Sequence, residues 1–324
     1  MIDKNAIDRA ALYARLKRPE GPVDVVLDTD TCNEIDDQFA LAYLILSDDK
    51  LNLKGVFAAP CINDKCATVE EGMEKSYEEI LKVLRIMNRE DLNDIVYRGS
   101  TEFLPSEEVP VVSEAAEKLI EISKDYTSEK PLYVAAIGAI TNIASAILMD
   151  PTIVERIYVI WLGAHMKDIG HNLEYNLMQD VASGRVVVQS GVPLVLMPAQ
   201  GGTSHLVTTK PELVYWLKDR NPLCDFLLEN TVTYCEDESK GRVPRTWSKV
   251  IWDIAAIAWL LDGDFVSDRI ITAPLFTYDH HSSDDPDGLP IRYVYQLFRE
   301  PIYEDLFTKL IGHQLDRRQW HCDT

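Results

Sequence analysis

The chain has 324 residues, of which 32 are basic and 53 are acidic, so its formal net charge is −21. A chain of this length buries about three quarters of the surface that its unfolded form exposes, which excludes disordered and collagen-like architectures. The acidic balance argues against a nucleic-acid partner, because binding to phosphates requires a basic surface.

Two further observations concern the cellular location. No apolar run approaches the ~20 residues that a membrane helix needs, and residues 1–21 mix charges where a signal peptide has an apolar segment. The six cysteines are irregularly spaced and form no CxxC pair, a pattern typical of reduced thiols rather than of disulfides or a zinc site. We therefore expect a cytoplasmic protein that does not bind membranes.

Short apolar runs rich in β-branched residues alternate with helical patterns along the chain. After a first helix at 7–16, strands are predicted at 23–27, 53–59, 95–97, 132–137, 157–162 and 192–197. Helices are predicted at 36–46, 67–89, 113–124 (with Ser113 as its cap), 140–148, 182–189, 211–218, 223–234 and 251–261. This alternation predicts an α/β fold, a mostly parallel, Rossmann-like open sheet with helices on both faces and a helical C-terminal region. With no repeat or linker-like stretch, one domain spanning 1–324 is expected.

Carboxylates are concentrated after the first predicted strand. Residues 28–37 read DTDTCNEIDD and include Asp28, Asp30, Glu34, Asp36 and Asp37. Ligands of open α/β sheets bind outside the carboxyl ends of the strands, and acids gathered there repel each other unless a cation neutralises them. Oxygen ligands select Ca²⁺ or Mg²⁺. The alternative, that the last two acids only favour the helix dipole, leaves the other acids unexplained.

Four segments, in the same order along the chain, resemble the calcium-dependent nucleoside hydrolases, the inosine-uridine-preferring hydrolase family. The first is DTDTCNEIDDQFALAYLI, a strand ending in DTD that is followed by DD and an apolar helix. IGAITNIA at 137–144 resembles the family's GPLTNIA turn, and EYN at 174–176, with Asp180 after it, resembles EFN. WDIAA at 252–256 resembles HDPLA at a helix start. Together these segments span most of the chain.

The resemblance implies a metal site and a base. Ca²⁺ is expected to bind Asp30, Asp37, Asp253 and the backbone carbonyl of Ile137, and the ribose 2′ and 3′ hydroxyls complete its coordination. Asp30 is also expected to take a proton from the calcium-held water that attacks the anomeric carbon. The implied activity is hydrolysis of the N-glycosidic bond of a ribonucleoside, which gives ribose and a free base for purine or pyrimidine salvage.

The remaining implied roles concern the sugar and the assembly. Asp36, Glu174 and Asn176 are expected to hydrogen-bond ribose hydroxyls, and Asp28 is expected to lie just behind them and orient the others. The chemistry agrees with this assignment, because breaking a glycosidic bond builds positive charge on the sugar ring that nearby acids stabilise, and a carboxylate beside the water serves as base. The family also implies a homodimer or homotetramer.

The chain departs from the family pattern mainly on the side of the base. Five residues separate DTD from DD where the family has three, and Asn63 matches the asparagine of TTVAGN only loosely. The segment at 163–165 is GAH rather than GGN, and Trp252 replaces the histidine before the late aspartate. We predict that Trp252 stacks on the base, with a purely structural place in the core as the alternative. No base preference follows from the sequence.

Two other functions stay open at this point. A haloacid dehalogenase-type phosphatase also places DxD after the first strand, with Mg²⁺, Asp28 as nucleophile and Asp30 as acid and base. However, Cys32 stands where that signature has Thr or Val, and no convincing later lysine motif is found. The second alternative is a calcium-stabilised sugar-binding protein without turnover, because function depends on the details of a site rather than on the fold.

Overall fold

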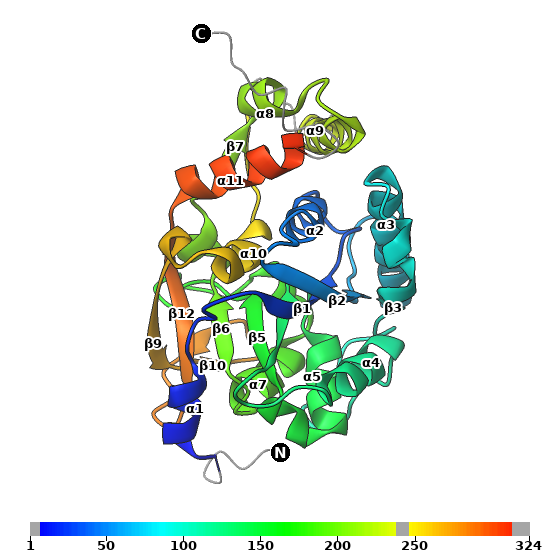
Figure 1. The fold of residues 1–324 in the computed structure, drawn as a ribbon. Helices are drawn as coiled ribbons and strands as arrows, with labels where there is room; N and C mark the ends of the chain where they lie inside the picture. The colour runs from blue at the N-terminus through cyan, green and yellow to red at the C-terminus, as the bar shows by residue number, and fades with distance from the viewer. Residues whose placement is uncertain (1–6, 238–245, 313–324) are drawn as a thin grey trace.

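The computed structural model describes residues 7–237 and 246–312. Its centre is an eight-stranded sheet of order β3-β2-β1-β4-β5-β6-β12-β9 (Figure 1). All neighbours are parallel except β9, which runs antiparallel to β12. The strands are β1 (Val23–Thr29), β2 (Leu51–Ala58), β3 (Val96–Arg98), β4 (Leu132–Ala136), β5 (Ile157–Leu162), β6 (Leu194–Met197), β9 (Val266–Thr272) and β12 (Pro290–Leu297).

Helices cover both faces of this sheet because successive side chains of a strand point to opposite faces. In β1, Val25 and Leu27 belong to one apolar cluster and Val26 to the other. The first cluster packs α2 (Asp37–Ile45), α3 (Val69–Ile86), α8 (Lys210–Leu217), α9 (Pro222–Cys235), α10 (Ile254–Leu261) and α11 (Arg299–Gly312). The second packs α4 (Glu114–Ser123), α5 (Thr141–Met149) and α7 (Val181–Gln189), and Figure 1 shows the two sets on opposite sides.

Shorter elements complete the fold. The helix α1 (Arg9–Arg15) lies beside β12, and α6 (Tyr175–Gln179) precedes α7. Two small antiparallel pairs join β7 (Val207–Thr209) to β8 (Ser248–Val250) and β10 (Leu275–Phe276) to β11 (Ser282–Ser283). The remaining turns are η2 (Glu90–Ile95), η3 (Pro151–Glu155), η4 (Ala199–Thr203) and η6 (Gly263–Phe265).

The predicted fold class is confirmed, and the predicted strands and helices are present with ends displaced by a few residues. Ser113 caps α4, since its side chain accepts a hydrogen bond from the backbone N of Ala116 at 3.2 Å. Two strands of the main sheet, β9 and β12, and the helix α11 were not predicted. Charged side chains such as Asp268 and Arg292 interrupt the apolar pattern of these strands, which weakens the period that identifies a strand.

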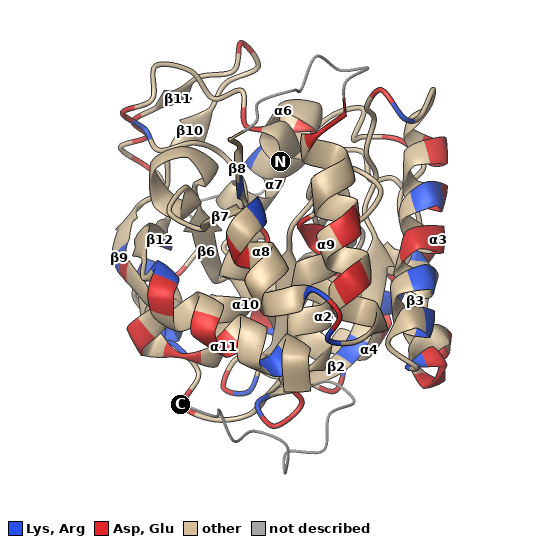
Figure 2. Ribbon diagram, turned by 90° about the horizontal axis from the view of Figure 1, so that it is seen from above, with Lys and Arg blue, Asp and Glu red and all other residues tan. Residues whose placement is uncertain are grey.

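The outer face of α3 is densely charged, with side chains of both signs (Figure 2). Figure 2 shows acidic and basic side chains alternating along this helix, while Met73 and Ile80 on its inner face are buried. Lys75 pairs with Glu71 one turn away at 2.7 Å.

Among the described residues no helix is long and apolar enough to cross a membrane, and the five cysteines of that part of the chain are free thiols.

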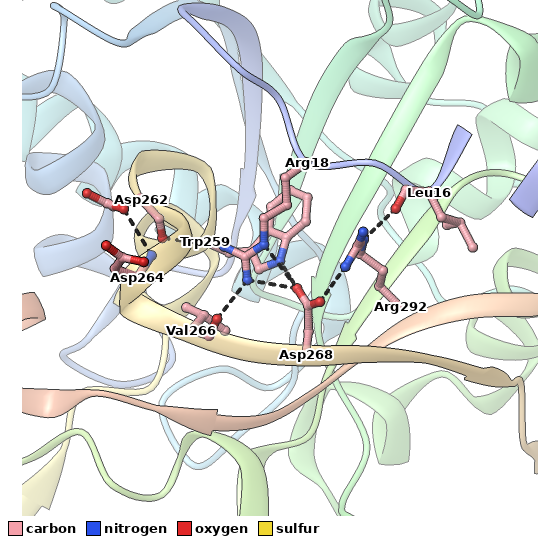
Figure 3. Close-up of polar contacts among 8 residues, drawn as sticks. All are labelled: Leu16, Arg18, Trp259, Asp262, Asp264, Val266, Asp268 and Arg292. Carbon is pink, nitrogen blue, oxygen red and sulfur yellow. Dashed lines mark hydrogen bonds and ion pairs between the residues drawn. The ribbon is translucent and has the colours of Figure 1, made fainter. Parts of the chain in front are cut away.

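A buried ion network ties the edge strand β9 to the rest of the molecule (Figure 3). The side chain of Asp268 is 5% exposed and accepts hydrogen bonds from Arg18 Nη2 at 2.8 Å and from Trp259 Nε1 at 2.7 Å. Arg292 of β12 donates to the other carboxylate oxygen. The network therefore joins the segment after α1, the helix α10 and two strands.

We expect Asp268→Asn to lower the free energy of unfolding by about 3 kcal/mol, because removing one partner leaves buried charges uncompensated. Urea denaturation measures this loss. Glu121→Gln is the control, since its carboxylate is 65% exposed and pairs with Lys118 on the surface, and such a surface pair contributes less than about 1 kcal/mol. Equal losses in the two variants would contradict the stabilising role of the network.

Candidate functional site

The site lies where the order of strand addition reverses. The strands β2 and β3 extend the sheet to one side of β1, and β4 lies on its other side, which opens a crevice at the carboxyl ends of β1 and β4. Asp30 follows β1 and Ile137 follows β4, and the backbone N of Ile137 donates to the carbonyl of Asp28 at 2.8 Å. A Cβ at Gly138 would lie 3.0 Å from Asp30 Oδ1, so glycine permits this close approach.

A cavity of about 190 Å³ opens at this crevice. It brings together eight of the nine residues that the sequence predicted for the site, and only Asp28 does not line it. The eight are Asp30, Asp36, Asp37, Ile137, Glu174, Asn176, Trp252 and Asp253. These eight residues come from segments that are far apart in the chain, but all of them line this one cavity.

Three carboxylates form the closest acidic group. One oxygen each from Asp36, Asp37 and Asp253 lies within 4.8 Å of the others, and all three side chains are buried. Asp36 and Asp37 stand at the start of α2 and Asp253 at the start of α10, and these two helices contact each other. Asp37 accepts a hydrogen bond from Thr29 Oγ1 at 2.5 Å.

Asp30, a fourth buried carboxylate, lines the same cavity but is not one of these three closely spaced acids. Burial, followed by the charges of Asp37 and Asp36, raises its pKa well above the usual value. Burial and the charge of Asp36 likewise raise the pKa of Asp37 to about 7. Asp30 Oδ2 is buried and has no hydrogen-bond partner among the described residues. Buried acids this close are unfavourable when ionised unless a cation compensates them, so this oxygen-only donor set fits a hard divalent cation.

The backbone carbonyl of Ile137 and the side chain of Asn176 contact each other. Asn176 Nδ2 donates to the Ile137 carbonyl at 3.1 Å and to the Leu162 carbonyl at 2.9 Å. It therefore links the ends of β4 and β5. A carbonyl oxygen has two lone pairs, so this hydrogen bond is compatible with a metal contact at Ile137.

Asp28 lies behind the cavity and is fully buried. Its Oδ1 accepts a hydrogen bond from Asn142 Nδ2 at 2.7 Å, and Asn142 Oδ1 accepts from the backbone N of Ser100 at 2.8 Å. Burial raises the pKa of Asp28 to about 7. Asn142 stands in the segment IGAITNIA, but no role was predicted for it. Its amide ties the end of β1 to α5.

Glu174 shapes the loop between β5 and α6. It caps α6, since its carboxylate accepts from the backbone N of Asn176 at 3.0 Å and of Leu177 at 2.8 Å. It also accepts from the backbone N of Ala164 at 2.9 Å, a residue held at φ +67°. Burial raises the pKa of Glu174 to about 7. Its helix-capping role was not predicted, although an acid before a helix is a known start signal.

Trp252 and His165 form two walls of the cavity. Trp252 is half-buried, and its backbone N donates to Asp36 Oδ2 at 2.9 Å. His165 Nδ1 accepts from the backbone N of Gln200 at 3.3 Å, so the ring proton of the neutral form resides on Nε2. Burial and the neighbouring His171 ring lower the pKa of His165, which keeps it a neutral donor.

Tyr234 and Lys249 lie beside the cavity, and Lys249 was not predicted as part of the site. Tyr234 Oη donates to Glu34 Oε1 at 2.7 Å, and Lys249 donates to Glu34 Oε2. Lys249 Nζ also lies 4.0 Å from Asp36 Oδ1. Glu34 and Lys249 are separated by 215 residues, so no local pattern in the sequence could pair them.

Comparisons with known proteins agree with this geometry. A probable ribonucleoside hydrolase of Dictyostelium discoideum is 28% identical over 109 residues, which are 33% of this chain and 32% of that protein. The structure matches a plant nucleoside hydrolase with a TM-score of 0.72 at 17% identity, over 90% of this chain and 99% of the other. It matches the type III effector XopQ, solved with adenosine diphosphate ribose, with a TM-score of 0.62 at 16% identity, over 94% and 98%.

The two structural matches show the fold, and the family follows from the sequence. The profile of the inosine-uridine preferring nucleoside hydrolases matches residues 25–284, a stretch that contains every predicted site residue. The chain therefore belongs to the inosine-uridine preferring nucleoside hydrolase family.

Proposed function

We propose that the protein hydrolyses the N-glycosidic bond of a ribonucleoside, with Ca²⁺ as its metal. The observation that carries this proposal is the convergence of Asp30, Asp36, Asp37 and Asp253, all buried, in one cavity of a chain of this family. Breaking a glycosidic bond develops positive charge on the sugar, and a site crowded with carboxylates suits that charge.

The proposed calcium ligands are Asp30, Asp37, Asp253 and the carbonyl of Ile137. Asp36, whose oxygen approaches those of Asp37 and Asp253, is close enough to contribute as well. A bound divalent cation supplies positive charge among the acids and lowers the pKa of a water it holds. The wholly oxygen donor set favours Ca²⁺ or Mg²⁺ over softer metals.

The side chains in and behind the cavity have different proposed roles. Asp30 accepts the proton of the attacking water, and its buried Oδ2, without a hydrogen-bond partner in the described part of the chain, provides the acceptor. Asp36, Glu174 and Asn176 bind ribose hydroxyls. Since Asn176 Nδ2 already donates to two backbone carbonyls, its contact with ribose falls to Oδ1. Asp28 orients the end of β1 through its hydrogen bond with Asn142.

Trp252 and His165 are proposed to handle the base. An indole donates one hydrogen bond but transfers no proton near neutral pH, whereas its face stacks on planar rings. His165, neutral and protonated at Nε2, offers a further donor to the same cavity. Leaving-group handling in this chain thus does not depend on a histidine directly before Asp253.

Binding without turnover is the second candidate function. The observations in its favour are Trp252 at the base side and the structural match to XopQ, which was solved with adenosine diphosphate ribose. Family membership argues against the haloacid dehalogenase-type phosphatase. The DD pair and Asp253 have no role in that reaction, yet they lie together in the cavity.

A panel of purine and pyrimidine nucleosides tests the proposal. Each nucleoside is incubated with the protein and Ca²⁺, and the release of free reducing sugar is measured with and without a chelator. We expect calcium-dependent release of sugar from at least one nucleoside. Binding of nucleosides with no release of sugar would support the second candidate, and phosphate release from a phosphomonoester would revive the phosphatase.

Trp252→Ala tests the proposed stacking. We expect weaker binding of a nucleoside and nearly unchanged binding of free ribose, because only the nucleoside carries the ring on which indole stacks. Isothermal calorimetry in the presence of Ca²⁺ measures both affinities. If Trp252 only fills the core, the variant should instead lose roughly 3–5 kcal/mol of stability, with equal binding of both ligands by the folded fraction.

A further inference from the structure

A buried ammonium group lies directly behind the cavity. Lys249 comes from β8, and its side chain is 12% exposed. It donates to Glu34 Oε2, whose partner oxygen accepts from Tyr234 Oη at 2.7 Å. Its Nζ also lies 5.4 Å from the centre of the Tyr234 ring. Lys249, Glu34 and Tyr234 thus form a triad that fastens the loop at 31–36 to β8 and α9.

The same ammonium reaches the acid that leads into α2. Lys249 Nζ lies 4.0 Å from Asp36 Oδ1, while Asp36 Oδ2 accepts from the backbone N of Trp252 at 2.9 Å. Both carboxylate oxygens of Asp36 therefore face groups of the segment at 249–252. The segment at 249–252 thus contacts the loop before α2 at Glu34 and at Asp36.

Lys249 acts through Asp36 rather than on a ligand, because it does not line the cavity whereas Asp36 does. Burial alone would lower the pKa of the Lys249 ammonium, but the charges of Asp36 and Glu34 outweigh burial and raise it. The group therefore stays charged. A buried charge fixed between two carboxylates strongly restricts where those carboxylates can lie.

We propose that Lys249, held in place by Glu34, is a positioning residue that fixes Asp36 for recognition of a ribose hydroxyl. This inference rests on the proposed function. It adds a specificity element from β8 to a site otherwise built from strand ends and helix starts. A hydrogen bond from a sugar hydroxyl to a correctly placed carboxylate contributes about 1.5–3 kcal/mol, which corresponds to about tenfold to hundredfold in affinity.

The test compares a ribonucleoside with its 2′-deoxy and 3′-deoxy analogues, because Asp36 can recognise only a hydroxyl that is present. In Lys249→Met we expect kcat/KM for the ribonucleoside to fall about tenfold or more. The preference over at least one deoxy analogue should fall by a similar factor. The loss should appear mainly in KM, since the hydroxyl is bound before and during the reaction. Lys249→Arg, which keeps the charge, should restore part of the preference.

The chain offers a closely matched control. Lys309 pairs with Asp305, whose carboxylate also accepts from Tyr43 Oη, and Lys309 Nζ lies 5.5 Å from the Tyr43 ring. This second Lys–acid–Tyr triad joins α2 to α11, away from the cavity lining. Lys309→Met should lower the unfolding temperature as Lys249→Met does, but leave the preference for ribose unchanged. Equal preferences in Lys249→Met and Lys309→Met would overturn the proposal.

A double variant separates positioning from general damage. If Lys249 acts only through Asp36, Lys249→Met should cause no further loss of ribose preference once Asp36→Asn is present. Independent, additive losses would overturn the proposal. Failure of the proposed function has a different signature, namely no sugar release by the wild type. In that case calorimetric binding of ribose and 2-deoxyribose with Ca²⁺ is the readout, and an equal ribose preference in wild type and Lys249→Met overturns the proposal.

Discussion

Turnover in Asp30→Asn should fall by a factor on the order of 10² or more. Asparagine preserves the size of the side chain but cannot accept the proton of the attacking water. Asp28 and Asp30 each have a buried Oδ2 without a hydrogen-bond partner in the described part of the chain, but of these two acids only Asp30 lines the cavity. Asp30 is therefore the one that can accept a proton from a bound ligand or water. The release of reducing sugar from the preferred nucleoside measures the effect.

Thermal unfolding should accompany this assay. Without calcium, Asp30→Asn should be as stable as the wild type or more stable, because burial and the charges of Asp37 and Asp36 disfavour the ionised form of Asp30. Asp94→Asn, which alters an exposed acid outside the site, serves as the control and should leave turnover unchanged. Near wild-type turnover in Asp30→Asn would show that the base lies elsewhere.

Calcium binding and stability should depend strongly on pH. The pKa values of Asp28, Asp37 and Glu174 are raised to about 7 by burial, against about 4 in an unfolded chain. Between these values the folded, calcium-free protein holds more protons than the unfolded chain. Its stability therefore falls as the pH rises from about 4 to about 7. Below about pH 7 calcium must displace protons from these acids. The affinity for calcium should therefore fall about tenfold for each unit by which the pH decreases, per proton displaced.

Melting curves with a chelator and with Ca²⁺, recorded from about pH 5 to about pH 8, measure both effects. The chelated protein should melt at lower temperature as the pH rises, and calcium should restore stability most at the upper end. At a concentration of 100 times its Kd, a ligand stabilises the fold by about 2.7 kcal/mol. A chelated protein that melts at higher temperature at pH 8 than at pH 5, with no response to calcium, would contradict the acidic metal site.

The sequence was most informative where neighbours in the chain are neighbours in space. Asp30 and Asp37 lie on either side of one strand–loop–helix connection, so a strand and a helix start were enough to bring them together. The alternation of strands and helices likewise predicted the parallel part of the sheet. Asp253 entered only through the resemblance to a family, because nothing in the local pattern around it indicates contact with α2.

Ion pairs between residues far apart in the chain could not be predicted from the sequence. Lys249 lies 215 residues from Glu34, and the short strand that carries it has no apolar alternation. The strands β9 and β12 carry Asp268 and Arg292, which read as surface residues until the structure shows them paired. Glu174 was predicted to hydrogen-bond the sugar. In the structure its carboxylate accepts hydrogen bonds from three backbone N–H groups, which the sequence did not predict.

The contact between α2 and α10 also sets an order of events during protein synthesis. Asp36 and Trp252, which join these helices, are 216 residues apart, and a ribosome that adds 5–20 residues per second needs roughly 10 to 40 s to cover that distance. Until then the acids at the end of β1 have no partner from α10. A nascent or prematurely terminated chain that stops before Asp253 thus lacks one carboxylate of the cluster, and the proposed calcium site is complete only after Asp253 has been synthesised and α10 has packed against α2.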